Sequence, residues 1–244
     1  MIISTFSFSL MNSFVKHLSH YPTFEIVFFR TAGSLLLGTI YILIKGIPIL
    51  GNSRRLMIFR ALAGITAMSL VFAVFLLKEK LKTIQWFLFL LAFSEVLILK
   101  GFDQELNTTG LLLVLVASIF SGLVYVLIRK IGNNDHPLVI VNYFMFLGTV
   151  IGGILSINGW IQPKENDWLL LLSLGIFGFF GQVFMTKAFQ IAKTNLVAPL
   201  KYIEVIFTIL IGVTWFDDIY SVWSLMGILM IIAALVANVL IGKR

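Results

Sequence analysis

The stretch GQVFMTKAFQIAKTNLVAPLKYIEVIFTILIGVTWFDD, from Gly181 to Asp218, decides how the rest of the chain is interpreted. It begins as an apolar run, is interrupted by the polar sequence AKTN, and continues as a second apolar run that carries Lys201 and Glu204 before its midpoint. A water-exposed helix would place these charges on a polar face, but residues 205–213 are almost all apolar. Ionisable residues inside a membrane span cost at least ~2.5–3.5 kcal/mol each, so they usually face a cavity or a partner. We therefore expect the remaining chain to supply that cavity.

Composition places the chain among membrane proteins. Of its 244 residues, 59% are hydrophobic and only 12% are charged, and the mean hydropathy is +1.03. Soluble domains are about 45–50% apolar and about 25% charged. The net charge of +7 does not indicate nucleic-acid binding, because the basic residues lie in short loops between apolar runs, where they act as topology signals. The absence of cysteine excludes disulfides, thiolate metal sites and a cysteine nucleophile.

The apolar runs have the length of membrane spans, which is roughly 20 residues. Short loops join nine such segments, at about 2–19, 24–45, 56–77, 84–101, 109–130, 137–157, 167–187, 195–216 and 220–241. We therefore predict an all-α polytopic membrane protein with nine transmembrane helices. Glycines recur in several spans, among them Gly148, Gly152, Gly175 and Gly178, and such spacing lets helices pack closely in lipid.

An internal repeat is visible, and its two halves differ in length. Gly64 in RALAGITAMSLVF matches Gly181 in GFFGQVFMTKAF at an offset of 117 residues, whereas Glu79 matches Asp218 at an offset of 139. The difference indicates that the first half lacks about 22 residues, or roughly one span with its loop. Repeated membrane halves are the architecture of secondary transporters, whose substrate site lies near the middle of the membrane.

The distribution of basic residues favours an ancestral ten-helix topology. We divide the chain into a first repeat of four spans, 1–104, and a second repeat of five, 105–244. With the missing helix restored and both ends inside, 14 basic residues fall on the inner side and 4 on the outer side: Lys16, Arg30, Lys100 and Lys164. Nine spans reduce the best division to 12 against 6. The sequence therefore indicates that one helix of ten is missing, through a natural deletion or because the sequence is incomplete.

Four motifs carry a family resemblance. They are FEIVFFR (Phe24 to Arg30), RALAG (Arg60 to Gly64), FLLKEKLK followed by Trp86, and KAF followed by APLKYIE (Lys187 to Glu204). In this order and spacing they resemble the EamA type of the drug/metabolite transporter superfamily, in the branch that contains importers of S-adenosylmethionine and riboflavin. The resemblance implies two inverted repeats that move a small metabolite by alternating access. It does not identify the substrate or the direction of transport.

Polar and charged residues inside the predicted spans are the candidate substrate contacts. Lys201 and Glu204 either form an ion pair that only holds the helix, or line the substrate path with Tyr202 beside them. Glu25 and Arg30 are five positions apart, so they do not share a helix face as i, i+4 partners would. Arg30 lies deeper in the span and needs a partner, and it either serves folding or gating or contacts the substrate. Pro199 frees a backbone carbonyl, as in the broken helices that line cavities. The candidate site comprises Lys201, Tyr202, Glu204, Gln182, Arg30, Glu25 and Asn142.

The sequence therefore predicts a secondary transporter of a small metabolite, located in the inner membrane as a multi-pass protein. The alternative is a non-transporting remnant or accessory protein of the same family, because about one helix is missing; a homodimer would be able to replace it. Motifs typical of membrane enzymes are absent, and no Gly-rich phosphate loop is present, so we expect neither catalysis nor a cofactor. We expect the partners to be the small-molecule substrate and the lipid bilayer.

Overall fold

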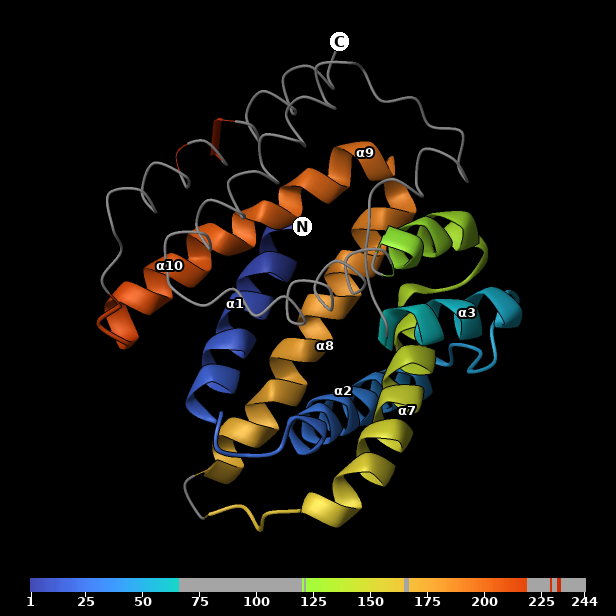
Figure 1. Ribbon diagram of the computed structural model, residues 1–244. Coiled ribbons are helices and arrows are strands. Elements are labelled where there is room, and N and C mark those ends of the chain that lie inside the picture. Colours follow the sequence, from blue (N-terminus) through green and yellow to red (C-terminus); the bar gives the residue numbers. More distant parts are fainter. Residues whose placement is uncertain (66–119, 121, 165–166, 219–228, 230–231, 234–244) are drawn as a thin grey trace.

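The computed structural model describes residues 1–65, 120, 122–164, 167–218, 229 and 232–233. Within these ranges all regular structure is helical (Figure 1). The predicted span 84–101 lies outside the described residues, and so does almost all of 220–241. The count of nine helices and the division into two repeats therefore stay predictions.

The described helices follow the predicted apolar runs. In chain order they are α1 (Ile2–His17), α2 (Thr23–Lys45), α3 (Arg54–Ile65), a helical stretch at 122–131, η1 (Gly132–Asn134), α7 (Pro137–Ser156), η2 (Ile157–Gly159), α8 (Asp167–Ile191), α9 (Thr194–Val197), η3 (Ala198–Tyr202) and α10 (Ile203–Trp215). Four segments are long and apolar enough to cross a membrane: Thr23–Lys45, Pro137–Gly159, Asp167–Ile191 and Ala198–Trp215. They coincide with four of the predicted spans, and the protein is an all-α multi-pass membrane protein.

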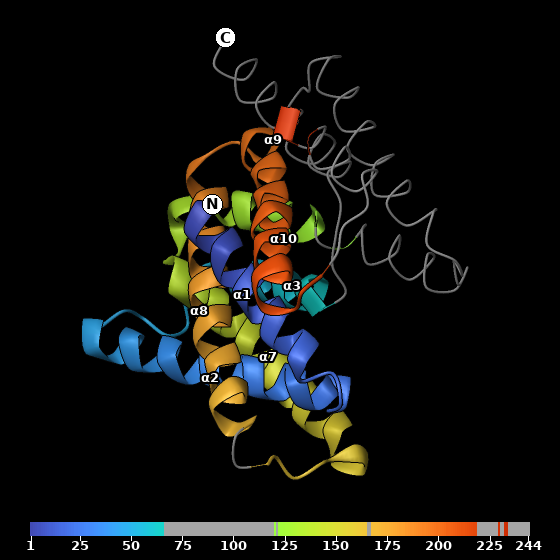
Figure 2. The same cartoon turned by 90° about the vertical axis from the view of Figure 1, so that its left-hand side faces the viewer.

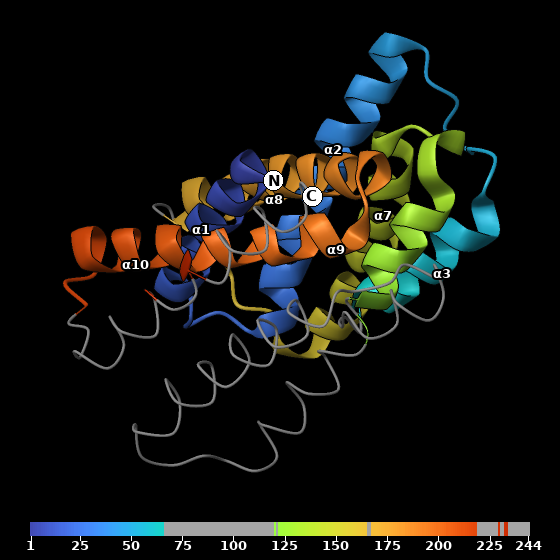
Figure 3. The same cartoon turned by 90° about the horizontal axis from the view of Figure 1, so that it is seen from above.

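The long helix α8 is the centre of the described bundle. On one side α1 packs against it, and α10 packs in turn against α1, so that α1 lies between α8 and α10 (Figures 2 and 3). On another side α2 crosses α8 at a steep angle and also packs against α7 (Figure 2). The shorter helix α3 packs against α7. Helices α1 and α2 from the first half of the chain and α7 from the second half therefore pack against α8.

Glycine allows α2 and α8 to touch along their backbones. A Cβ atom on Gly175 would lie 2.7 Å from the Cα atom of Gly33, and one on Gly33 would lie 2.9 Å from the Cα atom of Gly175. Beside this contact the Ser34 hydroxyl donates a 2.7 Å hydrogen bond to the carbonyl of Gly175. On α7, Gly152 approaches the backbone of α2 in the same way, because a Cβ atom on Gly152 would lie 3.0 Å from the amide nitrogen of Phe28. The packing role predicted for these glycines of α7 and α8 is confirmed, because only small residues allow such close approach.

One end of the bundle is tied together by Asp135. Its carboxylate accepts hydrogen bonds from the backbone N–H groups of Asn52 and Ser53, at 2.8 Å from Ser53, just before α3 begins. The side chain of Gln190, near the end of α8, donates to the carbonyl of Asp135 at 2.9 Å. The loops 46–53 and 132–136 and the end of α8 therefore lie at the same end of the bundle.

Other polar contacts close the opposite end. Lys16, near the end of α1, forms an ion pair of 2.7 Å with Asp218, just after α10. The Tyr21 hydroxyl donates a 2.8 Å hydrogen bond to Asp167, the first residue of α8. The last turns of α1 and α10 and the first turn of α8 therefore share this end, where the outer side was predicted.

A histidine cap starts α7. Nδ1 of His136 accepts a hydrogen bond of 3.3 Å from the amide of Leu138, and Pro137 occupies the first helical position. Partial desolvation of the ring lowers the pKa of His136 below its ordinary value, and the positive charge of Lys187 lowers it further. Only an unprotonated Nδ1 can accept this bond, so the same environment that disfavours protonation keeps the cap in place.

Candidate functional site: a charged cavity around α8

The second apolar run of the opening stretch is a broken helix. It starts as the short α9, tightens into η3 around Pro199, and becomes regular again in α10. Lys201 lies in η3 and Glu204 in the first turn of α10, three positions apart, and Lys201 Nζ lies 2.6 Å from Glu204 Oε2. Their side chains are 23% and 19% exposed, so this pair is largely shielded from solvent.

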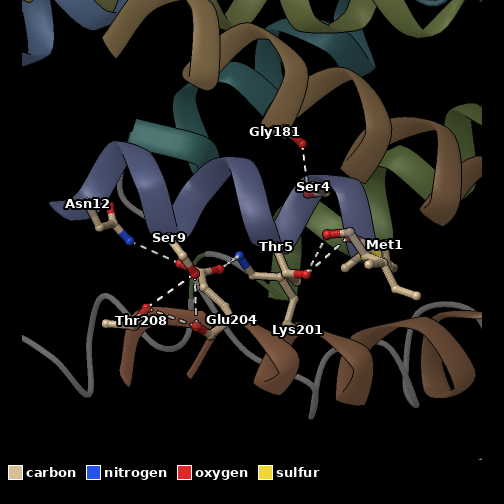
Figure 4. Close-up of polar contacts among 10 residues, drawn as sticks. Met1, Ser4, Thr5, Ser9, Asn12, Gly181, Lys201, Glu204 and Thr208 are labelled. Atoms are coloured by element: carbon tan, nitrogen blue, oxygen red, sulfur yellow. Dashed lines mark hydrogen bonds and ion pairs between the residues drawn. The ribbon is translucent and has the colours of Figure 1, made fainter. Parts of the chain in front are cut away.

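Helix α1 completes the surroundings of this pair (Figure 4). The side-chain amide of Asn12 donates a 3.0 Å hydrogen bond to Glu204 Oε1, so both carboxylate oxygens have partners. The Ser9 hydroxyl donates at 2.9 Å to the backbone carbonyl of Glu204. Lys201 Nζ lies 4.4 Å from the centre of the Phe8 ring, within the range of a cation–π contact. The charges of η3 and α10 are therefore held against α1.

A third charged residue near α8 is Arg60, on α3. Its side chain is 1% exposed, and its Nη2 donates a 2.9 Å hydrogen bond to Oε1 of Gln182 on α8. The guanidinium carbon lies 4.7 Å from the centre of the Phe144 ring on α7. Nε and Nη1 have no hydrogen-bond partner among the described residues. In the described part of the chain, a neutral amide and an aromatic ring thus contact this buried cation, and no carboxylate pairs with it.

Arg30 supplies a second guanidinium from α2. Its Nε atom is buried and has no hydrogen-bond partner in the part of the chain that the structure describes. The aliphatic part of the side chain lies beside α8, since a Cβ atom on Gly178 would be 3.3 Å from Arg30 Cγ. Burying such donors without partners is costly, so they are expected to have a use in the molecule.

These groups line one cavity of about 270 Å³. Each of the long helices described, and the stretch 122–131, contributes to its wall. The described residues that line it are Phe8, Met11, Asn12, Arg30, Arg60, Gly64, Val124, Tyr125, Phe144, Gln182, Met185, Lys201 and Glu204.

The structure brings together four of the seven residues proposed from the sequence. Lys201, Glu204, Gln182 and Arg30 all line the cavity. Tyr202 is adjacent in η3 and half-buried, but it is not among the lining residues.

The other two proposed residues lie away from this cavity. Glu25 is fully buried at the start of α2, where its Oε2 accepts a 3.0 Å hydrogen bond from the amide of Ile161 in the loop before α8. Asn142 donates a 3.2 Å hydrogen bond to the hydroxyl of Thr39 and lines a separate, mainly apolar cavity of about 450 Å³. In this structure Glu25 holds a loop and Asn142 joins α7 to α2.

Sequence reasoning missed Arg60 and Asn12 as cavity residues. Arg60 was interpreted as a topology signal near an inner helix end, but it is the seventh residue of α3, about 9 Å along the axis from Arg54. Its distance from the start of the predicted span, and the apolar residues that follow it, could have indicated that Arg60 lies inside the membrane. Asn12 is a polar residue within the weakly apolar first segment and would have been found by the same criterion.

Nothing in the described part of the chain resembles a metal centre. No group of three or more His, Cys, Asp or Glu side chains there could hold a metal ion. The arrangement around α8 is instead suited to binding a solute, because it combines charged and amide groups with aromatic walls in one concave site.

Comparison with known proteins gives consistent matches. Residues 108–240 match the EamA-like transporter family. The pseudopaline exporter of Pseudomonas aeruginosa is 27% identical, and the match covers 97% of this chain and 93% of that protein. Solute carrier family 35 member G1 of Homo sapiens is 26% identical over 96% of this chain and 76% of its own length. The S-adenosylmethionine uptake transporter of Rickettsia prowazekii is 26% identical over 70% of this chain and 58% of its own length.

The length of one match is informative. The alignment with the exporter extends over 266 residues, which is 22 more than the 244 residues of this chain. At least 22 residues within the matched region of the exporter therefore have no counterpart here. That shortfall is close to the length of one membrane span.

Proposed function

Because this chain belongs to the EamA-like transporter family, as its motifs predicted, we propose that it moves a small metabolite across the inner membrane by alternating access. The cavity around α8 would be the substrate site, open to one side of the membrane and then to the other. Relatives that are named as transporters favour transport over catalysis. No nucleotide-binding motif occurs in the sequence, so ion coupling or exchange would supply the energy.

The observation that carries this proposal is the burial of ionisable groups among apolar helices. Arg30, Arg60, Lys201 and Glu204 converge on one cavity of about 270 Å³ from four different elements. Charges inside a membrane bundle are costly and typically mark a substrate or ion pathway. A membrane protein without a transport function would be more stable with apolar residues at these positions.

Transport of a metabolite mixture tests the proposal without knowledge of the substrate. Proteoliposomes that contain the purified protein would be loaded with a cell extract, and the metabolites released would be compared with those from protein-free liposomes. We expect at least one metabolite to be released by the parent protein and retained by Lys201→Ala. Lys164→Ala, at an exposed lysine in the loop before α8, should behave as the parent. Equal release from protein-containing and protein-free liposomes would count against transport.

The alternative, a non-transporting relative, is favoured by the shortfall of at least 22 residues. The contact between Asp135 and Ser53 weighs against it. Ten helices place the loops 46–53 and 132–136 on the same side of the membrane, whereas nine helices with simple alternation place them on opposite sides. The 2.8 Å hydrogen bond between Ser53 and Asp135 agrees with the first arrangement. We therefore propose that the two halves keep the relative orientation of a ten-helix transporter.

A further inference from the structure

We propose that the substrate of the α8 cavity is a small organic anion, bound by the guanidinium groups of Arg30 and Arg60. The inference rests on the proposed transport function and names the chemical class of its substrate.

The charge balance of the cavity supports this inference. Four ionisable side chains among the described lining residues carry charge at neutral pH: Arg30, Arg60 and Lys201 are positive, and Glu204 is negative. Lys201 and Glu204 form an ion pair at 2.6 Å, and neither Arg30 nor Arg60 has a direct ion-pair partner among the described residues. A buried charge in a membrane bundle requires a counter-charge, and a bound anion would supply it.

Free hydrogen-bond donors point to the same class of solute. Nη2 of Arg60 is used by Gln182, but Nε and Nη1 are buried without a partner among the described residues, and so is Nε of Arg30. A guanidinium group has only donors and matches the oxygen atoms of carboxylate and phosphate groups. The acceptor-rich end of an organic anion would satisfy these donors together with the charge.

The remaining wall suits the organic part of the solute. Phe8, Phe144 and Tyr125 line the cavity, and Tyr125 is held in place by stacking on Phe189 with ring centres 4.2 Å apart. The volume of about 270 Å³ lies near the lower limit of the ~300–1,000 Å³ typical of ligand sites, which indicates a small solute.

A purely structural role explains less of this geometry. A guanidinium group that served only to join α3 to α8 would be expected to face a carboxylate, yet Arg60 faces the neutral amide of Gln182 and the ring of Phe144. A cationic substrate would meet an excess of two positive charges. An anion would lower the net charge of +2 that the described lining residues carry, and a dianion would cancel it.

The sign of the field in the cavity can be measured with charged thiol reagents. The chain has no cysteine, so Asn12→Cys places the only thiol beside Glu204 in the wall. The purified variant would be labelled with 2-sulfonatoethyl and 2-(trimethylammonium)ethyl methanethiosulfonate, which are of similar size and opposite charge. The rate constant for labelling by each reagent would be divided by the rate constant of the same reagent with a small thiol in solution, which corrects for their different intrinsic reactivities.

We expect the anionic reagent to be favoured by about sixfold, the ratio that Coulomb's law gives between an anion and a cation at about 8 Å from one unit positive charge in water. Adding Arg60→Gln or Arg30→Gln to the cysteine variant should each lower this preference. Adding Lys164→Gln, which removes the same charge from an exposed loop, should leave it unchanged. Equal rates for the two reagents, or faster labelling by the cation, would overturn the inference, and this result does not depend on whether the arginine variants fold.

Protection of the same thiol distinguishes carboxylate from phosphate. Labelling of Asn12→Cys by the neutral reagent N-ethylmaleimide would be measured with succinate, inorganic phosphate or tetramethylammonium present. If succinate alone slows labelling of the thiol, the site binds carboxylates. If inorganic phosphate alone slows labelling, the site binds phosphates. Slowing by tetramethylammonium alone would refute the anion site.

These measurements do not require transport, so the two proposals can fail separately. A preference for the anionic reagent without release of any metabolite would refute the proposed function only. Release of a metabolite without that preference would refute the anion inference only.

Discussion

Replacing Lys201 by methionine separates a structural ion pair from a transport residue. Methionine keeps most of the length of the lysine side chain and its contact with Phe8, but it removes the ammonium group. Glu204 Oε2 then loses the partner at 2.6 Å, while Oε1 keeps the amide of Asn12 at 3.0 Å. The carboxylate would remain in a site where its side chain is only 19% exposed.

The expected cost follows from this partial burial. Exposed ion pairs contribute about 0–1 kcal/mol, and removing one partner of a fully buried pair costs about 3–5 kcal/mol. With exposures of 23% and 19%, the pair lies between these limits, and we expect Lys201→Met to lower the free energy of unfolding by about 2 kcal/mol. Adding Glu204→Gln removes the carboxylate charge that Lys201→Met leaves without its ion-pair partner. The double variant should therefore recover about 1 kcal/mol or more of the lost free energy of unfolding.

Unfolding in mixed detergent micelles and release of metabolites from proteoliposomes would be measured on the same preparations. If the pair lines the substrate path, the double variant recovers stability without recovering transport. If the pair only holds the helix, stability and transport recover together. A Lys201→Met protein with the stability and transport of the parent would refute both roles.

Three further predictions concern the scaffold. Gly175→Ala should destabilise the protein by about 1–3 kcal/mol, because its Cβ would lie 2.7 Å from the backbone of α2. The control Gly153→Ala meets only a phenylalanine ring at 3.3 Å and should cost less, so equal thermal stability of the two variants would contradict this prediction. Cysteines at Arg54 and Asn134 should be labelled by impermeant maleimide from the same side of the membrane, and labelling from opposite sides would refute the proposed orientation. The pKa of His136 is lowered in the folded protein, so its contribution to stability should be complete above the ordinary value of about 6.5 and lost as the pH falls through the folded value. His136→Ala should therefore be about 0.5–1 kcal/mol less stable than the parent at pH 8, and this difference should narrow as the pH falls below about 6.5. An equal difference at pH 8 and pH 5 would rule out titration of the cap.

The sequence by itself determined the class of the protein and the positions of its long described helices. Runs of about 20 apolar residues can cross a bilayer only as helices, because backbone groups in lipid must bond within their own segment. The helices at 23–45, 137–159, 167–191 and 198–215 were therefore predictable one by one. The break around Pro199 was also predictable, since proline cannot donate the backbone hydrogen bond of a regular helix.

Only the tertiary structure decided which polar residues meet. The position of Arg30, Gln182, Lys201 and Glu204 inside apolar runs indicated that each needs a partner, but the packing of α1 and α2 against α8, and of α10 against α1, decides that they share a cavity. The packing of α3 against α7 brings Arg60 into that cavity, whereas Glu25, at the start of α2, bonds to the loop before α8 instead. The physical reason is that a buried charge is stabilised by whatever group lies within a few ångströms, and those neighbours come from helices more than a hundred residues apart, as Arg60 and Gln182 do.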